Sequence, residues 1–139
     1  MRPGDHICVD RGSSRDDGIY ISREQVIHFS RGASPDGKES VICSTTLKEF
    51  APGGWNTWVG IVDYRDQPHF SYVEVMRRAT SQLGRHGYND LGDHDCAHFA
   101  RWCATGESAK LKKRGLDLDE KRLRETFKPR GAKPGPVSS

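Results

Sequence analysis

The sequence lacks a long hydrophobic run and is poor in apolar residues generally. No stretch of its 139 residues approaches eighteen consecutive apolar side chains, so we expect no transmembrane helix. Hydrophobic residues make up 34% of the chain against 29% charged, and the mean hydropathy is -0.77. These values fit one small domain with a modest core. The first five residues also lack the apolar stretch of a signal peptide, so we expect a cytoplasmic location.

Recognisable metal-binding and disulfide patterns are also missing. The sequence has neither a Cys-x-x-Cys pair nor a His-Glu-x-x-His motif, and the spacing of its cysteines does not suggest a zinc site. Without an export signal we expect free thiols rather than disulfides. We predict no cofactor, and the loose group of His86, His94 and His98 is the main hint of a metal site. The four cysteines are Cys8, Cys43, Cys96 and Cys103.

Charge is distributed unevenly along the chain. The formal net charge is +3, but residues 107–139 contain ten Lys or Arg and five Asp or Glu, and therefore carry +5. Residues 1–106 carry the balance of −2. We therefore expect a folded domain over 1–106, followed by a basic, partly disordered tail over 107–139. Basic clusters such as Lys112-Lys113-Arg114 suit peripheral contact with anionic lipid headgroups or RNA phosphates.

Hydrophobic periodicity predicts strands first and helices afterwards. Residues 24–25 read as a tight turn that joins two strands into a hairpin. Apolar residues at helical spacing predict an amphipathic helix over residues 71–83, capped by Ser71 and ended by Gly84. A further helix begins near residue 95 and ends before Gly106. This order predicts an α+β fold, with an antiparallel sheet packed against helices. The predicted strands are 6–10, 18–21, 26–29 and 58–64, with a turn at 11–17, a loop at 31–40, a short helix or turn at 44–50 and a polar connector at 87–94.

Cys96 stands at the first turn of the last predicted helix. Unpaired backbone N–H groups and the positive end of the helix dipole stabilise a thiolate there, which favours a nucleophile. Periodicity alone favours a second interpretation, in which Cys96 is a core residue. Cys96, Phe99, Ala100 and Cys103 are spaced i, i+3, i+4 and i+7, which is typical of the buried stripe of an ordinary amphipathic helix.

Several motifs, in this order and spacing, resemble the lecithin:retinol acyltransferase (LRAT) domain family. The resemblance covers roughly residues 3–106. The family is a circularly permuted relative of papain-like peptidases, so the resemblance implies a permuted papain-like fold. The motifs are Pro3-Gly4-Asp5-His6-Ile7, Gly18-Ile19-Tyr20-Ile21, Val26-Ile27-His28-Phe29 and the run Asp95-Cys96-Ala97-His98-Phe99-Ala100-Arg101-Trp102-Cys103.

The resemblance implies a catalytic set of one cysteine and two histidines. Cys96 matches the nucleophile and His28 the second histidine, but Asp16 stands where the family has its first histidine. Asp95 and Ala97 likewise replace the usual Asn and Glu. With Asp16 as orienter, His28 becomes the candidate base of a Cys-His-Asp triad. A structural histidine within an apolar strand is the alternative for His28.

Two functions follow from the resemblance. The first is a thiol-dependent acyltransferase or phospholipase, in which Cys96 attacks an acyl ester of a glycerophospholipid and passes the acyl group to water, an alcohol or an amine. The second is a non-catalytic module of the same fold that has lost its base. Some picornaviral 2A proteins are similar and work by binding host factors or RNA, a role that the basic tail would fit.

Overall fold

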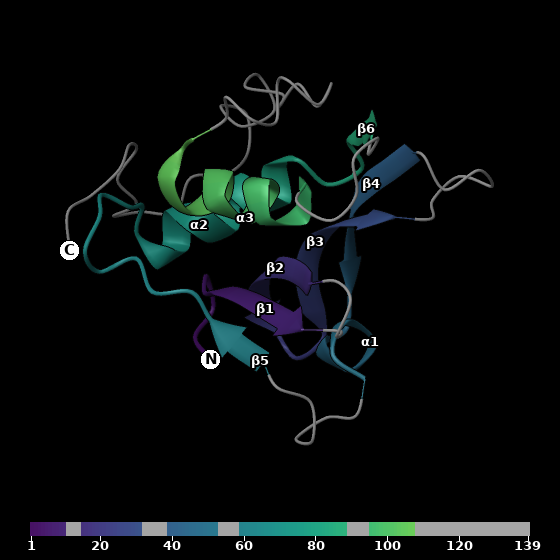
Figure 1. Ribbon diagram of the computed structural model, residues 1–139, viewed down its shortest axis with the longest axis horizontal. Helices are drawn as coiled ribbons and strands as arrows, with labels where there is room; N and C mark the ends of the chain where they lie inside the picture. The colour runs from purple at the N-terminus through teal and green to yellow at the C-terminus, as the bar shows by residue number, and fades with distance from the viewer. Residues whose placement is uncertain (11–14, 32–38, 53–58, 89–94, 108–139) are drawn as a thin grey trace.

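The computed structural model describes residues 1–10, 15–31, 39–52, 59–88 and 95–107, and they form the predicted α+β fold. The described strands pair into one antiparallel sheet with the order β5-β1-β2-β3-β4-β6 (Figure 1). The basic tail lies outside the described residues. The strands are β1 (His6–Asp10), β2 (Arg15–Ser22), β3 (Gln25–Arg31), β4 (Glu39–Thr45), β5 (Val59–Ile61) and β6 (His86–Tyr88); the helices are α1 (Leu47–Phe50), α2 (Tyr72–Ser81) and α3 (Asp95–Thr105).

The centre of the sheet is the β2–β3 hairpin that the sequence predicted. Its register places Gly18 opposite His28 and Ile19 opposite Ile27. A side chain at position 18 would bring a Cβ within 2.9 Å of Val26, which explains why glycine precedes the Ile-Tyr pair. The ladder between the two strands starts at Gly18, whereas β2 begins three residues earlier, at Arg15. Residues 15–17 pair with β1 instead.

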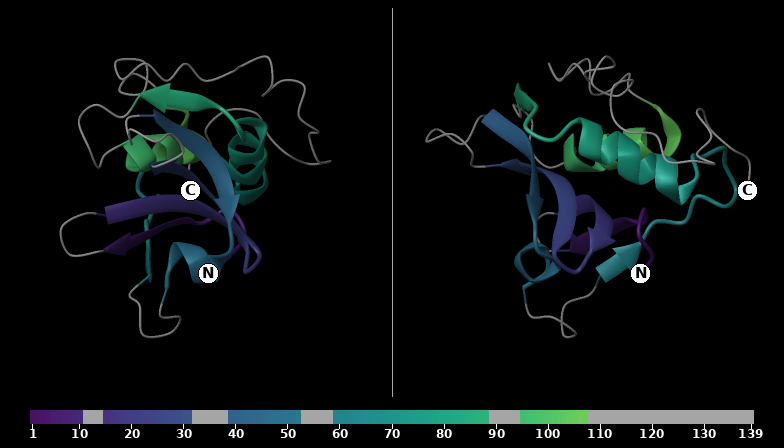
Figure 2. Two further views of the ribbon diagram at one scale, coloured as in Figure 1. Left: turned by 90° about the vertical axis from the view of Figure 1, so that its right-hand side faces the viewer. Right: turned by 180° about the vertical axis from the view of Figure 1, so that it is seen from behind.

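Helices α2 and α3 pack together over one face of the sheet, as two views from opposite sides show (Figures 1 and 2). Strand alternation sends every second residue of β2 and β3 into this layer, beginning with Ile19 and Ile27. The predicted helix stripe, from Cys96 to Cys103, meets them there. The cluster consists of Ile19, Ile27, Phe29, Ile42, Phe70, Val75, Ala79, Cys96, Phe99, Ala100, Trp102 and Cys103.

The opposite face of the sheet has a smaller core, closed by α1. Phe50 from this helix packs against Val26 of β3 and the apolar residues of β1. Thr46 and Glu49 form a reciprocal capping box, in which each side chain accepts from the other's backbone N–H. The two faces of the sheet are therefore distinct environments. Successive side chains of β2 or β3 point alternately to the helical layer and to the smaller core.

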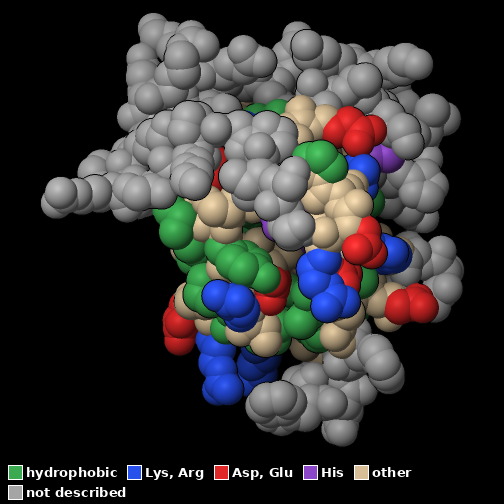
Figure 3. Space-filling model, turned by 90° about the vertical axis from the view of Figure 1, so that its left-hand side faces the viewer, with side chains coloured by type: hydrophobic (Ala, Val, Ile, Leu, Met, Phe, Trp, Pro, Cys, Tyr) green, Lys and Arg blue, Asp and Glu red, His purple; other side chains and the backbone are tan. Residues whose placement is uncertain are grey.

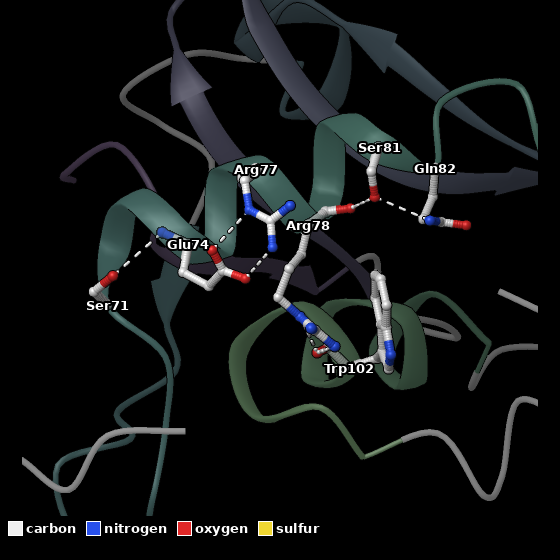
Figure 4. A network of polar contacts seen from close by, with 7 residues as sticks. All are labelled: Ser71, Glu74, Arg77, Arg78, Ser81, Gln82 and Trp102. Carbon is white, nitrogen blue, oxygen red and sulfur yellow. Dashed lines mark hydrogen bonds and ion pairs between the residues drawn. The ribbon is translucent and has the colours of Figure 1, made fainter. Parts of the chain in front are cut away.

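Arg78 is an arginine within the helical layer. Its guanidinium lies 4.2 Å from the ring centroid of Phe70 and 4.0 Å from that of Trp102. Nε and Nη2 both donate to the Trp102 carbonyl, at 3.3 and 3.2 Å (Figure 4). On the same helix, Arg77 forms a two-point ion pair with the buried Glu74. Arg78 thereby joins α2 to α3 by stacking and by hydrogen bonding.

The two predicted amphipathic helices and the hairpin are confirmed, and the strand expected over 58–64 is shorter, since β5 covers only Val59–Ile61. Three segments predicted as turn, loop or connector contain strands instead. Residues 11–17 were expected to be a turn, yet β2 already begins at Arg15. Strand β4 occupies part of the predicted loop and short helix, because pairing with β3 outweighs its polar composition. The short edge strand β6 overlaps the first two residues of the predicted polar connector and is held by its backbone ladder with β4.

We predict that Arg78→Lys lowers the free energy of unfolding by about 1–2 kcal/mol. Lysine cannot stack a planar group between two rings or donate twice to one carbonyl. Urea unfolding at pH 7 measures the effect, with Arg23→Lys on the exposed hairpin turn as the matched control. Equal stability of the two variants would contradict this role for Arg78.

Candidate functional site

The Cys96 sulfur lies at the start of α3 and faces the backbone of β2. Its thiol donates to the Arg15 carbonyl oxygen, with Sγ and O 3.6 Å apart. The backbone amides of Asp17 and Ala97 also point at the sulfur. Only 7% of the residue is exposed. Cys96 thus combines both sequence interpretations, because it belongs to the core stripe and occupies the helix start.

Burial raises the pKa of the Cys96 thiol to about 11. The two facing amides favour the thiolate, whereas the carboxylates of Asp17 and Asp16 oppose it by charge repulsion. The helix-start position is therefore not enough to ionise this thiol at neutral pH.

Asp17 is the centre of a buried polar network on the same face of the sheet. Its side chain is 1% exposed, and its Oδ2 lies 2.6 Å from Nε2 of His6 on β1. Arg15 donates to both carboxylate oxygens, at 3.1 and 2.8 Å. Burial alone would raise the pKa of Asp17, but the hydrogen bonds from His6 and Arg15 outweigh it, so the pKa is lowered.

The network continues from His6 to Tyr64. A carboxylate only accepts hydrogen bonds, so Nε2 of His6 carries a proton toward Asp17. In the neutral ring, Nδ1 then accepts from the Tyr64 hydroxyl, 2.8 Å away. The two rings also stack, with centroids 5.8 Å apart. One aspartate thus connects β1, β2 and the segment that follows β5.

His28 lies among the residues of the smaller core. Its Nε2 is 3.1 Å from the Thr45 hydroxyl oxygen and 3.7 Å from Cys43 Sγ, and its ring packs edge-on against Phe50. Because Ile27 and Phe29 join the cluster that contains Cys96, alternation directs His28 to the opposite face.

Asp16 is half-buried on β2, opposite Val9 of β1. Alternation places it on the same face as His28, while its charge still raises the pKa of Cys96. The structure therefore brings Asp16 and His28 to one face of the sheet and Cys96 to the other, where it meets Asp17.

A groove of about 530 Å³ opens at the other end of α3, near Ala104. His6 and Tyr64 line it, together with exposed Ile61 and Tyr72. The segment between β5 and α2 runs along this side of the molecule, where hydrophobic side chains lie next to arginine or lysine (Figure 3). Within the described ranges, no three His, Cys, Asp or Glu side chains gather as metal ligands.

Sequence reasoning missed the network of His6, Asp17 and Tyr64. It treated residues 11–17 as a turn, so alternation was not applied to Asp17. Extending the strand by three residues would have placed Asp17 and Ile19 on one face and opposed Asp17 to Cys8. The link to Tyr64 spans 58 residues, and no periodicity in the sequence predicts it.

We predict that Asp17 contributes stability that is lost in acid. Its folded-state pKa lies below the unfolded value of about 3.9, so the ionised carboxylate stabilises the fold above that pH. This contribution disappears as the pH falls through the lowered pKa. Urea unfolding at pH 7 and pH 3 should show a smaller acid loss for Asp17→Asn than for the unmodified chain.

The matched control is Asp63→Asn, which removes the exposed partner of Arg65. It should keep the acid loss of the unmodified chain, because an exposed pair contributes little. Identical acid losses in the unmodified chain and in Asp17→Asn would contradict the assignment.

Comparison with known proteins identifies the family. The family model described as lecithin retinol acyltransferase matches residues 1–109, which includes the described domain. No curated protein sequence matches the chain. None of the described helices is long and apolar enough to cross a membrane. The match extends over most of the chain, and the α+β fold with a cysteine at the start of α3 agrees with it. The chain therefore belongs to the lecithin retinol acyltransferase family.

Proposed function

We propose that this chain is a weak thiol-dependent acyltransferase or phospholipase that acts on glycerophospholipid acyl esters. The observation that carries the proposal is the position of Cys96 at the start of α3, with two backbone amides facing its sulfur. The cysteine stands where the family motif has its nucleophile. These two amides, of Asp17 on β2 and of Ala97 in the first turn of α3, suit an oxyanion that forms on the attacked carbonyl.

The proposed reaction has two steps. The Cys96 thiolate attacks the ester carbonyl, a C–S bond forms, the C–O bond breaks, and the leaving alkoxide of the lysophospholipid takes a proton. Water, an alcohol or an amine then attacks the thioester and releases the thiol. The first step needs a thiolate, so the base is the critical group.

Two versions of the proposal differ in the base. In the triad version His28 removes the thiol proton and Asp16 orients His28. This requires the His28 ring to leave Thr45 and Phe50 and to reach the opposite face of the sheet, where Cys96 lies. In the impaired version Asp16 has replaced the base and its charge disfavours the thiolate. We favour the impaired version, because it needs no rearrangement of the sheet and agrees with the raised pKa of Cys96.

We predict that acylation of Cys96 accelerates with pH. With a thiol pKa of about 11, the thiolate fraction should rise about tenfold per pH unit from pH 7 to 9. The assay incubates the full chain with 4-nitrophenyl butyrate or a short-chain phosphatidylcholine and locates the adduct by intact and peptide mass. Cys96→Ser should abolish the adduct at position 96, while a rate that is already constant at pH 7 would refute a protonated thiol.

A second prediction separates the two versions. Asp16→His restores the family residue. Because position 16 lies on the face opposite Cys96, β2 must turn this side chain toward the sulfur before the histidine can act as a base. With that turn, the acylation rate at pH 7.5 should rise by at least about tenfold, which is below the roughly 100-fold of a well-placed general base. Asp16→Asn is the matched control, since it removes the charge without adding a base. The impaired version expects Asn to be modestly faster than Asp, and the triad version expects it to be slower. A histidine variant no faster than Asp16→Asn would count against a base at this position.

A non-catalytic interaction module is the alternative. The buried thiol with two nearby carboxylates favours it, because this environment keeps the sulfur neutral. The acylation assay decides between the functions, since no adduct between pH 6 and 9 supports the module. Salt-sensitive binding to RNA or anionic liposomes that is lost on truncation after Gly106 would then assign that role to the basic tail.

A further inference from the structure

Two backbone groups of β2, the Arg15 carbonyl and the Asp17 amide, face the Cys96 sulfur, and together they form what we call its cradle. Residues 15–17 extend beyond the start of the ladder with β3, and the start of α3 lies against the backbone of this segment through the thiol of Cys96. The Arg15 carbonyl accepts from the thiol, and the Asp17 amide faces the sulfur. The position of this short segment therefore determines both backbone contacts of the thiol with β2.

An ion pair between the two outer residues of this segment fixes its shape. The Arg15 guanidinium donates to both oxygens of Asp17, and His6 holds the same carboxylate from β1. Asp17 is buried, whereas the Arg15 side chain is 52% exposed. The pair thus places one negative and one positive charge beside the sulfur, on the residues whose backbone forms the cradle.

The remaining surroundings of the sulfur are mostly apolar. β3 contributes Ile27 and Phe29, and α2 contributes Val75 and Ala79 to the cluster that contains Cys96. Charged groups that act on the thiol come from β2, where Asp16 and Asp17 disfavour the thiolate and Arg15 attracts it. From β1, Cys8 lies opposite Asp17, and His6 acts through its bond to that carboxylate.

We propose that Arg15 and Asp17 are positioning residues that control the reactivity of the Cys96 thiol with opposite signs. Arg15 favours the thiolate and neutralises Asp17, while Asp17 holds the cradle in place and disfavours the thiolate. The inference rests on the proposed function for its biological meaning. Its test measures the thiol directly and needs no acyl transfer, so either can fail without the other.

The experiment follows alkylation of Cys96 by iodoacetamide in the full chain from pH 7 to 10, read by peptide mass. Arg15→Gln should slow the reaction at pH 8.5 by several-fold, up to about tenfold for a change of one pKa unit. Asp17→Asn keeps the shape of the side chain and should accelerate it by a similar factor. The midpoint of the pH profile should move to higher pH in Arg15→Gln and to lower pH in Asp17→Asn.

Arg65→Gln is the matched control, because Arg65 also pairs with an aspartate two residues away but at an exposed site. It should leave the rate at Cys96 unchanged. A purely structural pair would loosen the cradle in both variants and accelerate both, which overturns the proposal. The same change in both variants, or no change in either, also overturns it. The Arg15 side chain is half-exposed, so we expect Arg15→Gln to fold. Its slower alkylation therefore tests the proposal even if Asp17→Asn fails to fold.

Discussion

The burial of the Asp17 carboxylate is the constraint around which this domain is arranged. An unpaired buried charge costs several kcal/mol, so the carboxylate requires partners from more than one element. His6 supplies one from β1, and Arg15 supplies two hydrogen bonds from β2 itself. Tyr64 completes the chain from the segment after β5. The start of α3 then lies against the backbone of the same aspartate, so sheet and helical layer meet at one charge.

This arrangement sets stability against reactivity. The carboxylate that fixes the segment under α3 also repels a thiolate at Cys96, and the apolar cluster around the sulfur acts in the same direction. A helix start is commonly taken as an activating environment for cysteine. Here two backbone amides are outweighed by burial and by neighbouring carboxylates. The local geometry of a nucleophile is present, and its activation depends on charges contributed by the adjacent strand.

Much of the fold was predictable from local signals. Ser71 caps the start of α2 as expected, because helix caps depend on residues near in sequence. The helix ends at Ser81 with Gln82 as its C-cap, two residues before the predicted end. The β2–β3 hairpin was equally accessible, although its turn lies at residues 23–24, one residue before the predicted turn at 24–25. Strands β4 and β6 were not, since they depend on pairing partners distant in sequence. At the site, the helix-start position and the motif around it identified Cys96. Asp17 was not identified, because the orientation of its side chain follows from where β2 begins.

Among the strands that the structure describes, those at the two ends of the sheet, β5 and β6, have three residues each. Edge strands expose unpaired backbone groups that can recruit another chain, and the hazard grows with their length and flatness. The longer strands β1 to β4 all lie inside the sheet, where each has a neighbour on either side. Most of their hydrogen-bonding groups are therefore paired within the sheet, and each described edge strand offers a template of only three residues to an intermolecular ladder. A domain with so small a core can in this way remain resistant to aggregation.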